Sequence, residues 1–269
     1  MNDNFNSLST ASIEAKLHKD VLEHEDKVVR IIIIVAFILM YIFRGSMSYW
    51  LRFGVAIPSS YDFTPISTEL EPVQEEYSDI EKIQKTFIYD SLINDHQMRV
   101  IPQAHYKLSG LAVAYNYSFV FISEFFDSAA LYDLGAAWGK LGEKDFYNKY
   151  FESYSQKTEL SGSRILWTRF KKYPAPVSRE YADSHYSHSH IVPANRNIMA
   201  ALLQIKVWDK VEIEGDLIDM EYPVNAPKDK VRHYYTSMSR DDPPSGDRGN
   251  GSCETVYVTR VKIGSRVYQ

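Results

Sequence analysis

Three histidines close together in the chain are the first residues that could do chemistry. The segment His185-Tyr-Ser-His188-Ser-His190 places imidazole rings three and two residues apart. Residues two apart on a strand point to the same face, so two of these rings could bind one Zn²⁺ or Cu²⁺ ion. No cysteine or carboxylate follows at a spacing typical of metal motifs. The sequence therefore favours the interpretation that these are polar histidines in a loop. Metal binding is the alternative. We expect no cofactor.

The single cysteine, Cys253, suggests a second chemistry. Together with His190 as base and either Asp241 or Glu254 as acidic orienter, it provides the groups of a thiol nucleophile. A lone cysteine at the start of a strand is more often a small buried hydrophobe, so catalysis by Cys253 is the less favoured interpretation. One cysteine also excludes a disulfide within the chain.

A third candidate is Arg240, which is followed by Asp241 and Asp242 beside a glycine-rich loop. A guanidinium could bind a carboxylate or phosphate through two parallel hydrogen bonds, or it could pair internally and hold the loop. We expect His190, Arg240 and Asp241, with Trp138 nearby, to form one polar binding site where strands join loops.

The elements that must position these residues begin with an apolar run, Ile31–Phe43, which is hydrophobic on every side. Extended to residues 28–51, the run is long enough to cross a bilayer, so we predict a single transmembrane helix. A buried core helix is the alternative. More basic residues precede the run than follow it, which predicts a cytoplasmic N-terminus. The C-terminal part would then be extracytoplasmic, in a bacterium the periplasmic side of the inner membrane.

The rest of the chain divides by composition. We predict a polar tail at residues 1–27, an acidic proline-containing spacer at 52–78, a helix at 79–98 and a β-rich extracytoplasmic domain at 99–269. The net charge of −5 provides no basic field, so nucleic acid is excluded as an expected partner. We expect envelope or membrane proteins as partners instead.

Short strands with few helices predict an α+β fold that is mostly β: a small, mostly antiparallel barrel-like domain of OB-like or SH3-like size. Alternation of apolar and polar residues is clearest at 209–217, where Val211 and Ile213 face inward. Asn195 is expected to cap a short helix. The other expected elements are strands at 106–115, 117–126, 164–170, 231–239 and 253–263, a glycine-rich loop at 133–142 and a helix at 144–154.

A set of short motifs runs through the C-terminal half. They are Trp138-Gly139, His190-Ile-Val-Pro193-Ala194, Gly215-Asp-Leu217, Ser237-Met-Ser-Arg240-Asp241 and Gly251-Ser-Cys253-Glu254. In combination this set resembles a family of uncharacterised bacterial proteins, often membrane-anchored, that has no established activity. The resemblance covers residues 106–263 and departs from the family in a longer loop at 242–250. It implies a domain boundary and candidate site positions, but no chemistry.

Two functions compete on these observations. The favoured one is a membrane-anchored extracytoplasmic binding or assembly module, acting between proteins in a bacterial envelope complex. The alternative is a membrane-tethered hydrolase that uses Cys253 and His190 with an acidic orienter. Whether these two side chains meet in the folded chain distinguishes the two.

Overall fold

The computed structural model describes residues 27–35, 52–117, 129–157, 164–172, 174–224, 230–238 and 253–269. The chain divides into two units, Met1–Leu51 and Arg52–Gln269. In the first unit, residues 27–35 are helical and their apolar side chains are exposed. Within the described ranges, no helix has both the length and the apolar character needed to cross a membrane. Most of the predicted transmembrane segment, residues 36–51, lies outside these ranges, as does the tail before Lys27.

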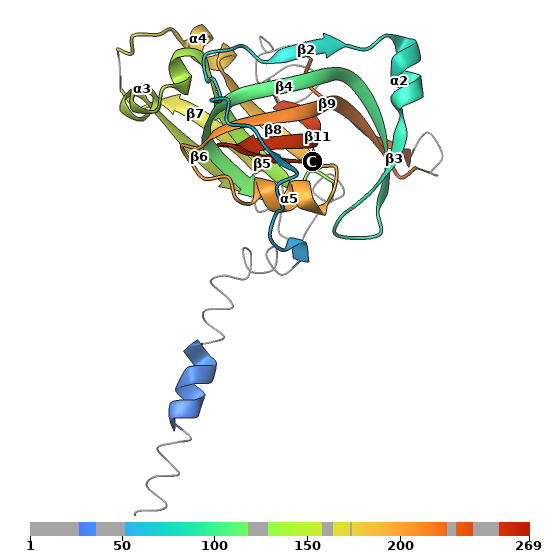
Figure 1. The fold of residues 1–269 in the computed structure, drawn as a ribbon, viewed down its shortest axis with the longest axis horizontal. Coiled ribbons are helices and arrows are strands. Elements are labelled where there is room, and N and C mark those ends of the chain that lie inside the picture. The colour runs from blue at the N-terminus through green and yellow to red at the C-terminus, as the bar shows by residue number, and fades with distance from the viewer. Residues whose placement is uncertain are drawn as a thin grey trace, which may run out of the picture. The chain divides into compact units, whose positions relative to one another are not determined.

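The second unit is built on a ring of five strands (Figure 1). Hydrogen bonds join the strands in the order β4, β5, β8, β11, β9 and back to β4. Every pair is antiparallel except β8 with β11, which run parallel. The expected mostly β fold is confirmed. The ring strands are β4 (Gln97–Tyr117), β5 (Tyr132–Ala137), β8 (Tyr186–Pro193), β9 (Lys210–Tyr222) and β11 (Cys253–Ile263).

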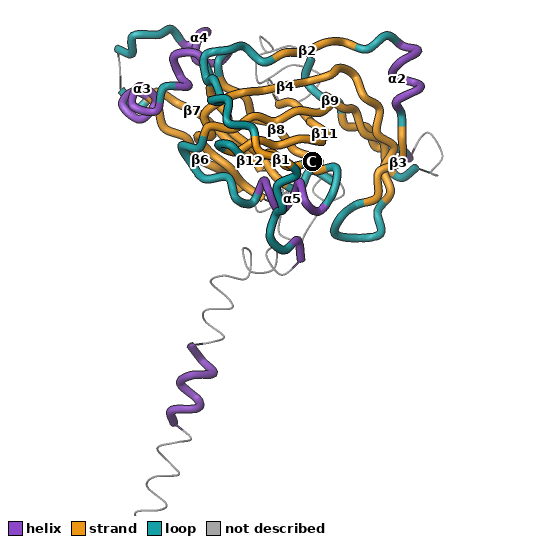
Figure 2. The backbone as a smooth tube through the Cα atoms, in the orientation of Figure 1, coloured by secondary structure: helices purple, strands orange, loops and turns teal. Residues whose placement is uncertain are grey.

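Shorter elements surround the ring (Figure 2). The sheet is extended by β1 (Ser60–Tyr61), β12 (Arg266–Tyr268), β10 (Arg232–Tyr234), β2 (Val73–Glu76) and β3 (Phe87–Asp90). A separate hairpin is formed by β6 (Phe151–Lys157) and β7 (Arg164–Phe170). The helices are α2 (Asp79–Lys85), the 3-10 helix η2 (Gly139–Gly142), α3 (Lys144–Tyr150), α4 (Arg179–Ser184) and α5 (Arg196–Leu202).

The two faces of the ring strands differ in chemistry, and β9 shows this most clearly. Val211, Ile213 and Leu217 are fully buried, whereas Glu212 and Glu214 between them form ion pairs on the opposite face. In a closed ring the charged, water-facing side must be the outside, so the apolar side chains fill the interior. Gly215 lies on the inner face, where an added Cβ would run into the carbonyl group of Tyr257. The predicted strand at 209–217 is confirmed.

Helix α5 lies near the C-terminus of the chain in Figure 1. It begins at the predicted cap, because the side-chain oxygen of Asn195 accepts a hydrogen bond from the amide of Ile198 at 2.9 Å. Five of its residues are buried, Ile198 to Leu202, so the helix packs its apolar side against the sheet. The predicted short helix after Asn195 is confirmed.

The predicted spacer at 52–78 is wrong, because these residues belong to the folded unit. Phe53 and Ile66 are buried, and the segment contributes β1 and β2 to the sheet. The buried Lys262 side chain donates to Asp62 Oδ2 at 2.5 Å and to the carbonyl of Thr64 at 2.8 Å. Prolines and acids mark this stretch as polar, but both strands in it are largely exposed edges, where polar residues are tolerated.

The predicted helix at 79–98 is correct only in its first half. Helix α2 starts at a capping box, in which Ser78 and Glu81 bond to each other's backbone amides, and it ends at Lys85. The next residues form strand β3, which pairs with β4. Thr86, Phe87 and Ile88 are β-branched or aromatic, which favours a strand over a continued helix.

Two segments that the sequence predicts as loops are strands buried on both faces. Residues 133–142 contain most of β5, and the histidine segment forms β8, where all eight residues are buried. A strand covered on both sides shows no alternation of polar and apolar residues, so the usual signal is missing. The remaining differences are smaller: the helix expected at 144–154 ends at Tyr150, the strand expected at 231–239 is reduced to β10, and residues 118–126 of another expected strand lie outside the described ranges.

Candidate metal centre

The outer face of β8 changes character along its length. Alternate residues point to this face, and they are Tyr186, His188, His190 and Val192. Tyr186 belongs to a hydrophobic cluster with α3, α4 and β6, and Val192 belongs to a second cluster with β3 and β4. The two histidines therefore lie between two hydrophobic clusters, where a polar side chain needs a specific partner.

His190 has such a partner in Asp133 on the neighbouring strand β5. The two residues are paired across the strands, and His190 Nδ1 donates to Asp133 Oδ1 at 2.8 Å. Asp133 is fully buried and His190 is 9% exposed. Because the carboxylate accepts from Nδ1, the other ring nitrogen, Nε2, is left with its lone pair, which is the arrangement that orients a histidine for metal binding.

His188 has its partner on the other side of β8, in strand β11. Cys253 pairs with His188 in the parallel register, and its Sγ lies 3.3 Å from His188 Nδ1. The rings of His188 and His190 are 4.4 Å apart between centroids. One potential ligand atom from each of His188, His190 and Cys253 lies within 4.8 Å of the others. The fold thus brings together two imidazoles and a thiol that are 65 residues apart in the chain.

This donor set fits a transition metal of borderline softness. Zinc binds histidine nitrogen at about 2.0 Å and cysteine sulfur at about 2.3 Å, so ligand atoms of a tetrahedral site lie about 3.5 Å apart. The spread of 4.8 Å in the structure is wider than this by about 1 Å. Binding of a tetrahedral ion would therefore require the three side chains to move closer together. Asp133 supplies the outer carboxylate that commonly accompanies a metal-bound histidine.

Small residues and two polar groups border this cluster on β4 and β5. Gly135 pairs with His188, and a Cβ added to it would lie 2.7 Å from the Tyr186 hydroxyl and 3.2 Å from the Ala114 side chain. Asn116 pairs with Asp133 on the same face. In the described part of the chain, the Tyr186 hydroxyl and the Asn116 Nδ2 group are buried and make no hydrogen bond. Buried donors without a hydrogen bond are uncommon in folded proteins, so both groups are available to contact a ligand at this face.

Burial and nearby carboxylates keep the Cys253 thiol and the Tyr186 hydroxyl protonated, because they raise the pKa of both groups. Burial, together with the carboxylates of Glu254 and Asp133, raises the pKa of Cys253 to about 12. Burial also raises the pKa of Tyr186 well above its ordinary value. Cys253 is therefore a neutral thiol at physiological pH unless a metal ion displaces its proton, and Tyr186 is a neutral hydroxyl.

Two of the predicted site residues lie in a different cluster. Trp138 Nε1 donates to Glu71 at 2.9 Å, and His185 Nε2 pairs with the same carboxyl group at 3.1 Å. The ring of Tyr181 stacks on His185 with centroids 3.7 Å apart. These contacts hold Glu71 against the domain, which is a structural role. The structure does not bring Trp138 or His185 to His190.

Glu254 follows Cys253 in β11 and so points to the opposite face. It is buried, and it accepts a hydrogen bond from the Ser187 hydroxyl at 2.6 Å on the inner face of the ring. Glu254 therefore does not orient His190, which is the role the sequence suggested for it. Arg240 and Asp241 lie outside the described residues.

The residue that sequence reasoning missed is Asp133. It is the one acid in the otherwise apolar stretch from Ala129 to Ala137. An isolated carboxylate inside a buried strand is costly unless it is paired, so this position carried a usable signal.

Comparison with known proteins finds no match for this chain, neither among protein-family models, nor among curated proteins, nor among solved structures.

Proposed function

We propose that this protein is a transition-metal-binding protein whose metal is held by His188, His190 and Cys253. The observation that carries the proposal is that ligand atoms of these three side chains lie within 4.8 Å of one another. The side chains come from two neighbouring strands, β8 and β11, and share one face. Asp133 supports the proposal, because it fixes the tautomer that presents His190 Nε2. Nitrogen and sulfur ligands of this kind suit Zn²⁺ and copper rather than Mg²⁺ or Ca²⁺.

The topology of the ring supports this choice of face. In chain order the strands are β4, β5, β8, β9 and β11, with α5 between the third and the fourth and one parallel pair between the third and the fifth. We infer that the ring is a small barrel of OB type. Such barrels bind ligands on the face of their second and third strands. In this chain those strands are β5 and β8, which carry Asp133 and both histidines.

A cobalt titration of the full-length chain tests the proposal. Co²⁺ added to the metal-free protein should give a sulfur-to-cobalt charge-transfer band at about one equivalent, since Co²⁺ commonly replaces Zn²⁺ at tetrahedral sites. Cys253→Ser should abolish the band and His188→Ala should weaken binding strongly. His185→Ala is the matched control, because His185 belongs to the Trp138 cluster, and it should bind as the unchanged chain does. The absence of the charge-transfer band in the wild-type chain would refute the proposal. An equal loss of cobalt binding in the His185→Ala control would refute it as well.

A thiol hydrolase remains the second candidate, because Cys253 Sγ lies 3.3 Å from His188 Nδ1. In that mechanism the imidazole would remove the thiol proton and the thiolate would attack a carbonyl carbon. The raised pKa of Cys253 disfavours it, since activated cysteines have a lowered pKa. Iodoacetamide discriminates between the two: a nucleophilic Cys253 would be alkylated fast at neutral pH in the metal-free chain, whereas the metal-binding account expects slow alkylation, slowed further by Zn²⁺.

The setting that we propose for this centre is the one the sequence suggests. Residues 28–51 would anchor the protein in the inner membrane, and the folded unit from Arg52 would lie on the extracytoplasmic side, available to envelope proteins. The support is the apolar run itself and the excess of basic residues before it. Alkaline phosphatase fused after Gln269 should be active in a bacterial host. An inactive fusion, together with a fluorescent cytoplasmic reporter at the same position, would overturn the orientation.

A further inference from the structure

The outer face around the proposed metal is arranged in two rows that cross four strands. Ala114, Gly135, His188 and Cys253 form one row, in the cross-strand registers of β4, β5, β8 and β11. The row beside it consists of Asn116, Asp133, His190 and Thr255. The two rows share one face, so the small residues of the first row lie next to the polar residues of the second.

The small residues make room for the Tyr186 side chain. Its hydroxyl lies above Gly135 and Ala114, so close that a Cβ on Gly135 would be 2.7 Å from the oxygen. Tyr186 is 7% exposed and Asn116 is 8% exposed. Asn116 is two residues from Ala114 on the same strand face, which is about 7 Å along the backbone. Both buried donors therefore lie on the outer face, on the β4 and β5 side of His188.

The acceptor side of Asn116 is already used. Its Oδ1 accepts from the amide of Tyr117 at 2.9 Å, and this leaves Nδ2 to donate. The Tyr186 hydroxyl can also donate. A pair of hydrogen-bond donors next to a metal with three protein ligands is suited to a negatively charged ligand, because the metal and both donors attract the same charge.

We propose that the metal held by His188, His190 and Cys253 takes a small anion as its remaining ligand, bound by Tyr186 and Asn116 as donors. The inference rests on the proposed metal site and adds the ligand class to it. Hydroxide and a small carboxylate share this chemistry.

Azide is a suitable probe, and the full-length chain loaded with Co²⁺ is the sample. Azide should shift the cobalt absorption bands with saturable affinity. Tyr186→Phe should weaken azide binding about tenfold, the usual effect of losing one hydrogen bond to a charged group, and leave cobalt affinity unchanged. Asn116→Ala should act in the same direction. Acetate, as a competitor of azide, and a pH titration of the spectrum distinguish a carboxylate from hydroxide as the natural anion.

Tyr132→Phe is the matched control. Tyr132 is fully buried, neighbours Asp133 in the chain, and has a hydroxyl without a hydrogen bond in the described part of the protein. It points to the opposite face of β5, so this change should leave azide affinity as it is.

The possible failures are separable. If cobalt binds but azide has no effect, or if Tyr186→Phe and Tyr132→Phe bind azide as the unchanged chain does, the anion proposal is wrong and the metal site stands. If cobalt does not bind, both proposals are wrong.

Discussion

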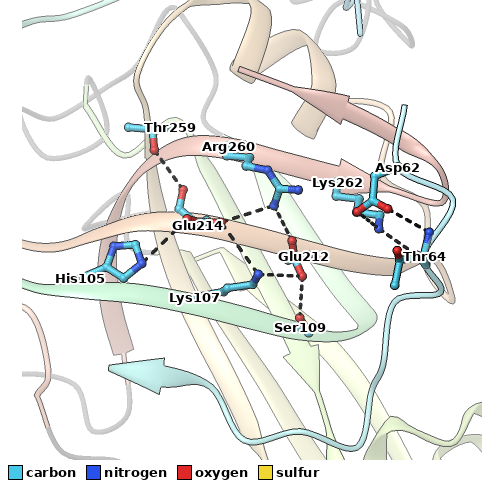
Figure 3. Close-up of polar contacts among 10 residues, drawn as sticks. All are labelled: Asp62, Thr64, His105, Lys107, Ser109, Glu212, Glu214, Thr259, Arg260 and Lys262. Carbon is cyan, nitrogen blue, oxygen red and sulfur yellow. Dashed lines mark hydrogen bonds and ion pairs between the residues drawn. The ribbon is translucent and has the colours of Figure 1, made fainter. Parts of the chain in front are cut away.

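Strand β11 carries two polar regions on the same face of the ring, and the two regions differ in how their polar side chains are paired. Near its end, Arg260 bonds Glu212, and Lys107 of β4 lies 3.3 Å from the same carboxyl group (Figure 3). Glu214 and His105 extend this charged network, in which acids and bases alternate across three strands. At its start, Cys253 faces two histidines and one carboxylate with little access to water. The partly exposed region pairs its own charges, whereas the buried region retains two donors, on Tyr186 and Asn116, without a hydrogen bond among the described residues.

From this difference we infer a structural role for the charged network and a ligand-binding role for the region around Cys253. In the charged network both carboxylates lie beside an arginine and a lysine and are partly exposed to water, so no further ligand is required. In the metal region, Tyr186 and Asn116 remain without acceptors among the described residues, and desolvation makes this costly. We attribute these two donors to a ligand because they lie on the same face as the proposed metal ligands.

The largest expected effect is on stability and comes from His190→Ala. This change leaves Asp133 fully buried without its histidine, and breaking a buried pair typically costs about 3–5 kcal/mol. Chemical denaturation of the metal-free protein should show a loss of this size. His185→Ala serves as the control, because its partner Glu71 is more than half exposed and can be hydrated, so no charge is left buried and the loss should be clearly smaller. Equal losses in the two variants would erase the contrast between buried and exposed polar groups.

A smaller effect is expected from Asp133→Asn on metal affinity. The amide keeps the shape of the side chain but no longer provides a charged acceptor for His190 Nδ1. Outer carboxylates of this kind change metal affinity about 10–100-fold when they are replaced. Ser189→Ala is the matched change, since that buried side chain is the cross-strand neighbour of Glu254 on the opposite face of β8 and bonds Ser187. Competition with a chromophoric chelator measures the metal affinity of both variants. If the Asp133 variant binds the metal as tightly as the wild-type chain, Asp133 does not support the metal site.

The smallest effect is expected in the charged network. Arg260→Ala should cost at most about 1 kcal/mol, because Lys107 still pairs with Glu212, and the loss should shrink as salt is added. Burial opposes ionisation of Glu212, but the bonds from Arg260 and Lys107 prevail and lower its pKa. Its contribution to stability is therefore present at neutral pH and is lost as pH falls through this lowered pKa. Thermal melts at low and high salt would show this, and a large salt-independent loss would contradict it.

The sequence predicted the parts of the fold whose residues alternate or carry a cap. The strand at Val211 and Ile213 has one buried and one solvated face, and the helix after Asn195 has a capping side chain, so local chemistry was sufficient for both. Strand β11 was expected at the residues where it is found. Strands β5 and β8 were missed because clusters outside the ring cover what would otherwise be their solvated face. Polar residues in β8 then look like a loop.

The sequence indicated the residues of the site, but not that they lie together in the folded chain. The spacing of His188 and His190 indicated a shared face, and Cys253 was nominated separately as a nucleophile. Their meeting depends on the parallel pairing of β8 with β11, a contact across 65 residues that no local pattern specifies. The same alternation that brings Cys253 to the histidines turns Glu254 away, so the acidic partner had to come from β5.

Elemental analysis of the purified full-length chain tests the central claim most directly. The protein should carry about one zinc or copper ion per chain after purification without added metal, and His188→Ala combined with Cys253→Ser should carry none. The variant His185→Ala should keep its metal. A metal-free wild-type chain that also fails to take up zinc or copper when they are supplied would contradict the claim, as would equal metal content in all three proteins.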